Sequence, residues 1–201
     1  NIGGISNFTL LDGSGSWNKV LTADLGPGNT LIDRFVNLHY QDFDFDKDGA
    51  ISSRGVVNQT SLYRLLDDDF FRKPFPKSTG QEYFNERYVL ERISTSLEGD
   101  DLIATLVAFT STSIKKGLEA LGVDQAELYV SGGGRFNPTL MKSLIKALPQ
   151  MKFLDIDSLG VSADAKEGLL FAVLANESLF GDGIFINSEH PNVRLGKLSF
   201  P

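Results

Sequence analysis

The sequence has 201 residues, and 41% of them are hydrophobic, which is enough to build a sizeable core in a soluble globular protein. Its 19 Lys and Arg and 26 Asp and Glu give a net charge of −7, which argues against broad electrostatic binding to nucleic acid or to an anionic membrane. Cysteine is absent, so neither a disulfide framework nor a thiolate metal site is available.

The chain carries no targeting signal that we recognise. It has no run of roughly 18 apolar residues and no signal-peptide pattern. We therefore expect a cytoplasmic protein with no membrane partner. Asn1 is not an initiator Met and leads directly into a strand-like run, so we also expect the chain to be part of a longer protein.

The first elements in the chain are a predicted hairpin and a helix. Runs of β-prone residues at 1–11 and 20–23 flank turn formers at 12–16, which is typical of a hairpin. The Gly-rich turn at 26–29 then precedes apolar residues at helical spacing over 30–36. A strand, a turn and a helix are therefore expected in succession.

Helical patterns dominate the middle of the chain. We predict one helix over 53–71 and a Pro-rich loop over 73–80. Apolar residues three or four apart over 101–121 predict a long half-buried helix that packs against a sheet.

Strands and helices alternate in the last third. Short strands are expected at 127–130, where the run reads as buried, and at 152–154. Helices are expected at 138–148, opened by a Pro, and at 163–179. This alternation predicts an α/β fold with parallel strand pairing.

Glycines gather at three places in or beside predicted strands, where the backbone can approach a ligand closely and direct N–H groups at phosphate. The alternative is ordinary turn chemistry. Ligands in open α/β sheets bind outside the carboxyl ends of strands, and two of the three places are such ends. The glycines are Gly3 and Gly4, Gly26 and Gly28, and Gly132, Gly133 and Gly134.

Asp24 follows an apolar strand and precedes the turn at 26–29. A carboxylate in this place can act as a general base, or hold Mg²⁺ through water. It can equally cap the turn by accepting local N–H bonds. The position by itself leaves both interpretations open.

The acidic segment 44–51 imitates the start of a calcium-binding loop, with acids at the first, third and fifth positions and Gly49 at the sixth. The twelfth position, which requires Glu, is Gly55. An acidic surface turn is the simpler interpretation. His39 and His190 lie far apart with no second ligand nearby, so we predict no protein metal site and structural roles for both.

These segments together resemble the anhydro-N-acetylmuramic acid kinase family, over nearly the whole chain and in the same order. The residues that carry the resemblance are Asn1 to Asn7, Asp24 to Asn29, Pro76 to Asn85 and Ser131 to Pro138, with support from Ser162 to Glu167 and Leu195 to Leu198. The resemblance implies a single ribonuclease-H-like or actin-like lobe, a mixed β-sheet with helices on both faces. Residues 1–201 would form the second, carboxyl-terminal lobe of a sugar kinase, with the first lobe absent.

The resemblance also implies an activity. The intact enzyme would use ATP and Mg²⁺ to open 1,6-anhydro-N-acetylmuramic acid with water and phosphorylate O6. Asp24 matches the family's catalytic carboxylate, the general base on the attacking water. Glu167 matches a family acid that could orient that water, and a solvated helix residue is the alternative.

Gly3 and Gly4 resemble the second phosphate-binding turn of the actin fold, and Gly132 to Gly134 the adenosine-binding turn, with Asn137 beside it. Gly26 and Gly28 belong to the turn after Asp24. The resemblance gives no role for 77–85. It also points to a homodimer.

Two departures leave another anhydrosugar substrate open: Leu25, where Thr is common in the family, and a longer acidic insert at 41–48. A non-catalytic nucleotide-binding lobe of the actin fold is the alternative function, and a calcium-regulated structural domain is a third.

Overall fold

The computed structural model of the chain describes residues 1–15, 19–160, 162, 165–182 and 193. They belong to two units, one of Asn1–Thr9 and Thr22–Asp155 and the other drawn from 10–21 and the chain after Asp155. Of the predicted site residues, only Glu167 belongs to the second unit. Within the described residues, no helix is both long and apolar enough to cross a membrane.

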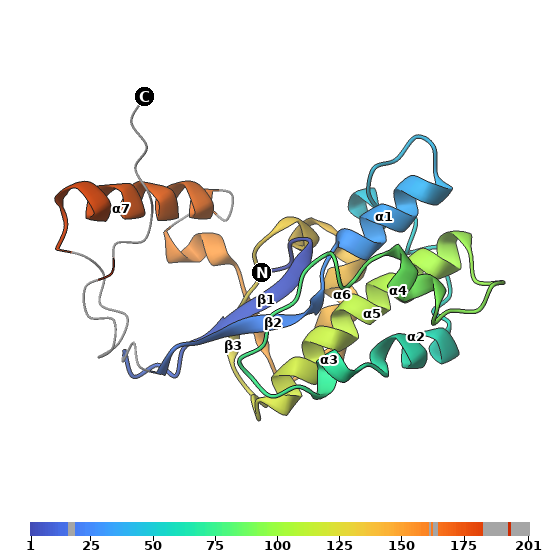
Figure 1. Cartoon of the computed structure of the whole chain (residues 1–201), viewed down its shortest axis with the longest axis horizontal. Coiled ribbons are helices and arrows are strands. Elements are labelled where there is room, and N and C mark those ends of the chain that lie inside the picture. Colours follow the sequence, from blue (N-terminus) through green and yellow to red (C-terminus); the bar gives the residue numbers. More distant parts are fainter. Residues whose placement is uncertain (16–18, 161, 163–164, 183–192, 194–201) are drawn as a thin grey trace. The chain divides into compact units, whose positions relative to one another are not determined.

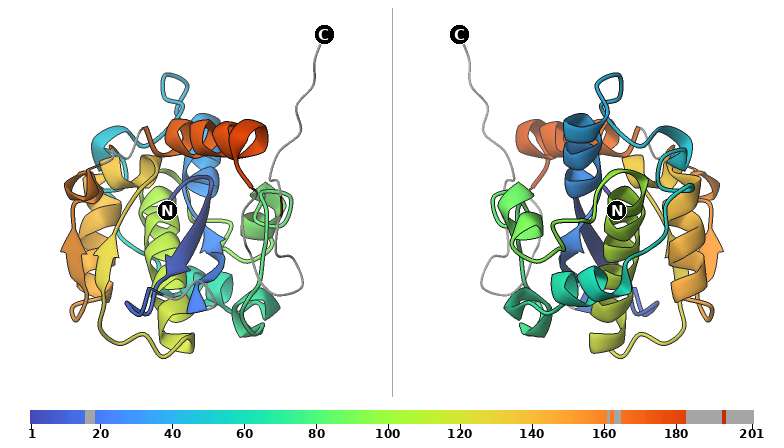
Figure 2. Two further views of the ribbon diagram at one scale, coloured as in Figure 1. Left: turned by 90° about the vertical axis from the view of Figure 1, so that its left-hand side faces the viewer. Right: turned by 90° about the vertical axis from the view of Figure 1, so that its right-hand side faces the viewer.

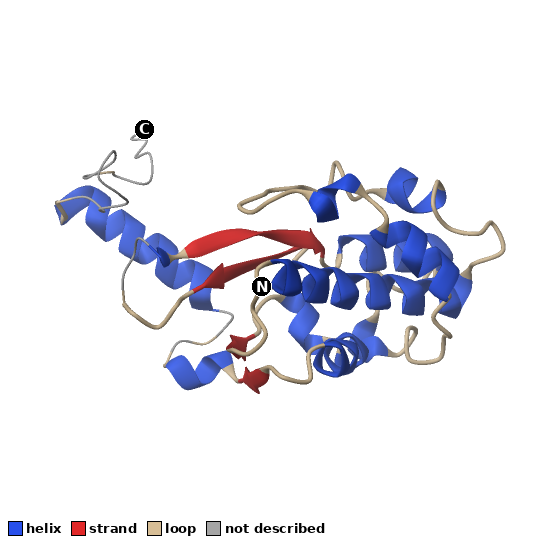
Figure 3. Cartoon of the chain, turned by 90° about the horizontal axis from the view of Figure 1, so that it is seen from below, coloured by secondary structure: helices blue, strands red, loops and turns tan. Residues whose placement is uncertain are grey.

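The described strands form two small sheets, not the one mixed sheet that we predicted (Figure 3). Strand β1 (Ile5–Leu10) pairs with β2 (Leu21–Pro27), as the predicted hairpin requires. Strand β3 (Glu127–Tyr129) pairs in parallel with β4 (Lys152–Leu154), with Glu127 opposite Lys152, so the parallel pairing is confirmed.

The two sheets stay separate because the chain bends just before β1. Gly3 and Gly4 form this bend, and the residues before it bond to the turn that follows β3. The Ile2 N–H donates to the Ser131 carbonyl at 2.7 Å, and the Ile2 carbonyl accepts from the Gly134 N–H at 2.9 Å. The backbone bonds of Ile2 therefore link the start of the first sheet to the turn after β3 without forming a ladder.

The predicted helix over 53–71 was wrong as one element. A turn at 50–55 is followed by α2 (Gln59–Leu66) and α3 (Asp69–Arg72). The side chains of Asn58 and Asp68 explain the break, because they accept from Ser61 N–H at 2.9 Å and Phe70 N–H at 2.8 Å. Each is an N-cap that starts a new helix.

The long helix α5 (Gly99–Ala120) is the centre of the first unit (Figures 1 and 2). We predicted a half-buried helix, but α5 is buried around its circumference over most of its length. Small and hydroxyl-bearing residues make this burial feasible, because their hydroxyls return to helix carbonyls, as Ser111 does to Ala108 at 3.1 Å. Helices α1 (Thr30–His39), α2, α3 and α6 (Pro138–Ala147) all contact it.

Aromatic rings fill the side of the core between α3, α4 (Glu86–Leu90) and α5. Phe84 is fully buried and meets Phe70 and Phe109 edge to face at centroid distances of 5.3 and 6.2 Å. The predicted loop at 73–80 is confirmed and joins these helices. In the second unit, α7 (Lys166–Phe180) confirms the helix predicted over 163–179, apart from its first residues, which lie outside the described part.

Candidate active site

The first two glycine turns are hydrogen-bonded to each other. The Gly4 carbonyl accepts from the N–H groups of Gly28 at 2.9 Å and Thr30 at 3.2 Å, and the Gly3 carbonyl accepts from Asn29 at 2.7 Å. A Cβ on Gly28 would overlap the Gly3 carbonyl. The N–H groups at the start of α1 are therefore used inside the protein, and glycine is needed there for backbone contact.

The third glycine turn packs on the residues before the first one. Gly132 has a φ of +88°, and a Cβ there would lie 2.6 Å from the Ile2 carbonyl oxygen. A Cβ on Gly134 would lie 2.8 Å from the Cβ of Ile2. The structure thus brings the glycine turns together, although this contact alone gives no ligand role to Gly26 or Gly28, which are both buried.

A groove of about 530 Å³ opens beside the meeting point of these turns. Its walls come from the start of α1, the acidic segment after α1, and the turn before α6. Two aromatic side chains line it with about half of their surface exposed, Phe45 and Phe136. The full lining is Asn29, Ile32, Asp33, Phe45, Asp46, Lys47, Asp48, Gly133, Phe136 and Asn137.

Asp33 is the perturbed carboxyl group of this groove. Burial raises the pKa of Asp33 to about 6, and the nearby charge of Asp46 adds to the shift. A carboxylate that is partly desolvated in a groove is a candidate for binding donors such as hydroxyl or amino groups.

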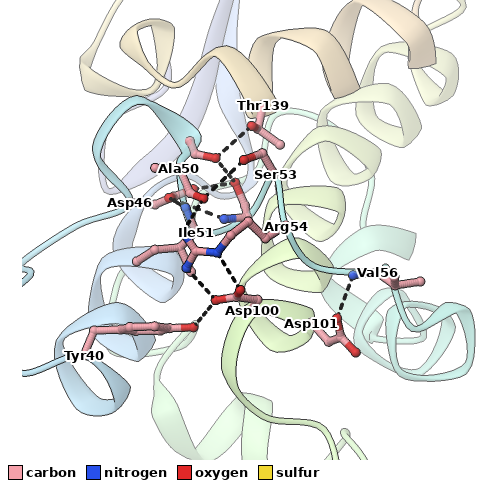
Figure 4. Close-up of polar contacts among 12 residues, drawn as sticks. Tyr40, Asp46, Ala50, Ile51, Ser53, Arg54, Val56, Asp100, Asp101 and Thr139 are labelled. Carbon is pink, nitrogen blue, oxygen red and sulfur yellow. Dashed lines mark hydrogen bonds and ion pairs between the residues drawn. The ribbon is translucent and has the colours of Figure 1, made fainter.

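Asp46 holds the acidic wall of the groove in place. Its buried carboxylate accepts from the Ile51 N–H at 2.8 Å, the Ser52 hydroxyl at 2.5 Å and the Asn137 amide at 3.1 Å. The wall is also tied to α6, because the Thr139 hydroxyl donates to the Gly49 carbonyl at 3.1 Å (Figure 4).

A second set of contacts fixes the same segment to the start of α5 (Figure 4). Arg54 forms two hydrogen bonds to the Asp100 carboxylate, at 2.8 and 2.9 Å, and Tyr40 donates to the same group at 2.5 Å. Burial and the bond to Asp100 raise the pKa of Tyr40 to about 12, so its hydroxyl keeps its proton at neutral pH. The start of α5, the start of α6 and the buried Asp46 carboxylate therefore position the acidic wall of the groove.

The acidic segment does not fold as a calcium loop. Asp46 points into the protein and is satisfied by protein donors, while Asp44 accepts from Asn37 at 3.3 Å. Across the described ranges, no three His, Cys, Asp or Glu side chains gather as metal ligands. The surface-turn interpretation was also incomplete, since this segment is a wall of the groove.

Asn137 lines the groove, but its side chain is occupied. The amide oxygen caps α6 by accepting from the N–H groups of Thr139 and Leu140, both at 3.0 Å, and the amide nitrogen donates to Asp46. Gly133 is different: it is exposed, and a Cβ there would meet only Asn29, at 3.5 Å.

Asp24 is half-buried in the middle of β2, and no hydrogen bond links it to the groove residues. Its N–H donates to the Lys77 carbonyl at 3.0 Å, and its Oδ2 accepts from the Thr79 N–H at 2.8 Å. The local cap of the adjacent turn is therefore not observed, because the N–H group that donates to the Asp24 carboxylate comes from a segment far along the chain. Glu167 is the second residue of α7, and its side chain lies outside the described part of the structure.

Sequence reasoning missed Asp33 and the acidic wall as groove residues. The signal for Asp33 was a lone acid among the apolar residues Leu31, Ile32, Phe35 and Val36. For the acidic wall, the signal was the acidic insert at 41–48, which carries the aromatic residues Phe43 and Phe45 among its acids. His39 stacks on Phe35 with ring centroids 6.1 Å apart, whereas His190 and the motif at 195–198 lie outside the described part of the chain.

Comparison with known proteins gives one consistent family. The sequence model described as anhydro-N-acetylmuramic acid kinase matches residues 1–183. Proteins named anhydro-N-acetylmuramic acid kinase are similar over the whole chain: one from Pseudoalteromonas atlantica is 39% identical, with 100% of this chain and 53% of that protein covered. One from Caldanaerobacter subterraneus is 40% identical, with 99% and 53% covered.

A relative of the same name from Shewanella sediminis is 41% identical, with 100% of this chain and 54% of that protein covered. The chain thus spans about half the length of the curated relatives that it matches. A match over residues 1–183 includes every predicted site residue. The chain belongs to the anhydro-N-acetylmuramic acid kinase family.

Proposed function

We propose that the protein containing this chain is an ATP-dependent kinase that hydrolytically opens 1,6-anhydro-N-acetylmuramic acid and phosphorylates its O6. The family match over residues 1–183 carries this proposal. The products would be N-acetylmuramic acid 6-phosphate and ADP. Residues 1–201 would be the carboxyl-terminal, actin-like lobe, and a first lobe would complete the sugar and phosphate sites.

Asp24 is the proposed general base. Its Oδ2 is held by the Thr79 N–H, while its Oδ1 accepts no hydrogen bond from any described residue. In the proposed reaction Oδ1 takes a proton from water, the water oxygen bonds to the anomeric carbon, and the bond from that carbon to O6 breaks. O6 then takes the γ-phosphoryl group of ATP. Glu167 is the proposed helper that orients the water.

The groove is the proposed subsite for the nucleoside part of ATP. Phe45 and Phe136 offer exposed faces to a planar base, and Asp33 can accept from hydroxyl or amino groups. Gly133 leaves room for close approach to backbone. Gly3, Gly4, Gly26, Gly28, Gly132 and Gly134 would act mainly by shaping the turns, because several of their N–H and C=O groups are already hydrogen-bonded within the protein.

Mg²⁺ is proposed to arrive with the ATP phosphates. Phosphate oxygens and water supply most of the ligands of Mg²⁺ in sites of this kind, so we assign it no protein ligand. Bound there, Mg²⁺ would neutralise charge that develops on the phosphates. The same proposal places the protein in the cytoplasm, where ATP is available, and includes a homodimer, which light scattering of the purified protein would test.

The activity is tested with the full-length protein, ATP and 1,6-anhydro-N-acetylmuramic acid. We expect release of ADP together with a phosphorylated, ring-opened sugar. Asp24→Asn should lower kcat by about 10²–10⁴-fold, because removing a general base costs this much. Full turnover by Asp24→Asn, or no sugar-dependent ADP release by the wild type, would sink the proposal.

A non-catalytic nucleotide-binding lobe is the second candidate, and the groove favours it, because a nucleoside could bind there without Asp24. Melting of the 201-residue chain with and without ATP separates the two. The kinase predicts weak stabilisation, since half of the phosphate site would come from a first lobe. Tight ATP binding to this chain, with no turnover by the full-length protein, would favour the second candidate.

A further inference from the structure

The segment 76–85 had no role from the sequence, and its first residues lie against Asp24. Lys77 accepts from the Asp24 N–H through its carbonyl at 3.0 Å. Thr79 donates its N–H to Asp24 Oδ2 at 2.8 Å. The backbone on either side of Ser78 therefore holds both the main chain and the carboxylate of Asp24.

The side chain of Lys77 anchors this stretch elsewhere. Its Nζ donates to the Phe70 carbonyl at 2.9 Å and lies 4.6 Å from the centroid of the Phe70 ring. The Phe75 ring is on the same ammonium group, at 4.5 Å. An ammonium group over two aromatic faces is attracted by both rings, and Phe70 is itself fully buried.

The Lys77 ammonium group is partly removed from water. Burial lowers the pKa of Lys77, and the charge of Lys73 adds to this effect. Protein groups thus replace part of the water around the ammonium group. A contact of this kind orders the loop around it. Here it holds the Lys77 carbonyl and the Thr79 N–H in the positions from which they bond to Asp24.

We propose that Lys77 is a positioning residue for Asp24: it fastens the 77–79 backbone to α3, so that Thr79 holds Oδ2 and leaves Oδ1 directed at the reacting water. The inference rests on the proposed function, because Asp24 must be the base. It goes beyond that function by giving the segment at 76–80 its task. Lys77 touches neither ATP nor sugar in this account.

The first test is steady-state kinetics of the full-length protein. Lys77→Met keeps the length of the side chain but loses the charge, and we expect kcat to fall about 10–100-fold, since a small misplacement of a catalytic group costs this much. KM for ATP and for the sugar should stay within about twofold, because binding groups are untouched. Lys77→Arg should restore kcat to within about fivefold, because guanidinium also stacks on rings and donates to carbonyls.

The matched control is Lys73→Met, a change to an exposed lysine directly after α3, four residues before Lys77. It should leave kcat and both KM values unchanged. Should Lys77→Met not fold, Lys77→Gln, which keeps a donor for the Phe70 carbonyl, replaces it and should show the same loss of kcat without a change in KM.

The second test measures the effect of Lys77 on the Thr79 backbone directly in the full-length protein. Amide hydrogen exchange followed by NMR should show the Thr79 N–H exchanging about tenfold faster in Lys77→Met than in the wild type, and unchanged in Lys73→Met. A wild-type rate for Thr79 in the folded variant would overturn the inference. So would a wild-type kcat in a variant whose Thr79 amide exchanges fast.

These outcomes separate the two proposals. Full activity of Asp24→Asn would remove the proposed function, whatever Lys77 does. If Asp24→Asn is impaired but Lys77→Met is not, only the positioning role fails. Adding Lys77→Met to Asp24→Asn should lower the residual kcat no further, because both changes act through one carboxylate. A second fall of the full size would contradict action through Asp24.

Discussion

At the scale of single residues, Asp33 is placed at a cost to stability. Its carboxyl group is half-buried beside Asp46, and burial raises its pKa to about 6. A group whose pKa is higher in the folded state binds its proton more tightly there, so ionisation opposes folding. A carboxylate that is kept in spite of this cost is typical of a functional groove.

The upward direction of the Asp33 pKa shift gives a prediction for the stability of Asp33→Asn. Below about pH 4 the carboxyl group is protonated in both states, and the variant should match the wild type. Between about pH 4 and 6 the wild type should lose stability relative to the variant, and above pH 6 the difference should stay near 1–2 kcal/mol after allowance for solvent screening. Urea unfolding from pH 4 to 8 measures it.

Asp42→Asn is the control for this titration, because Asp42 is an exposed carboxylate in the segment that follows α1. It should show no such pH-dependent gain. An Asp33→Asn gain that is equal at pH 4 and pH 8 would contradict the assigned cause, since packing changes do not titrate.

At the scale of elements, neighbouring glycines of one turn have different tasks. Gly134 is packed against Ile2, so its missing side chain is what lets two backbone segments approach. Gly133 is exposed in the groove with no neighbour closer than Asn29 to a Cβ. Gly134 therefore matters for the stability of the turn, whereas Gly133 matters for the proposed contact with a ligand.

The different surroundings of Gly133 and Gly134 predict different results for their alanine substitutions. Gly134→Ala should lower the free energy of unfolding by about 1–3 kcal/mol through overpacking against Ile2. Gly133→Ala should change it by less than about 0.5 kcal/mol, yet weaken ATP binding because its methyl group enters the groove. Urea unfolding and calorimetric titration with ATP measure both. Equal effects of the two changes on stability would show that the turn is packed differently.

At the scale of the whole molecule, α5 joins the helices of the first unit. It contacts α1, α2, α3 and α6, and its Thr110 hydroxyl donates to the Gly28 carbonyl at 2.8 Å, which ties the helix to the turn after Asp24. Elements with many buried partners open only when the whole unit unfolds.

We therefore expect the slowest amide hydrogen exchange in the chain's first unit over 102–114 of α5. Exchange in α4, a short helix with exposed Leu90, should be faster. Mass spectrometry of exchanged peptides checks this order. Protection of α4 equal to that of α5 would mean that the two helices unfold together.

Local patterns in the sequence determined the α/β class, the hairpin, α5, α6 and the parallel pair β3 and β4, because periodicity, glycine turns and an initial Pro act over a few residues. The prediction of one helix over 53–71 failed because apolar spacing alone does not show where one helix ends and the next begins. Apolar spacing continued across it, while the capping side chains of Asn58 and Asp68 set two starts.

The sequence by itself therefore determined most of the elements and the family, and it predicts Asp24 as the general base. Only the tertiary structure decided which groups meet: Lys77 and Thr79 at Asp24, and Asp33 facing the acidic wall. Thr79 is 55 residues from Asp24, and Asn137 is 91 residues from Asp46. Contacts of this separation depend on how helices pack around α5, and no local pattern encodes that packing.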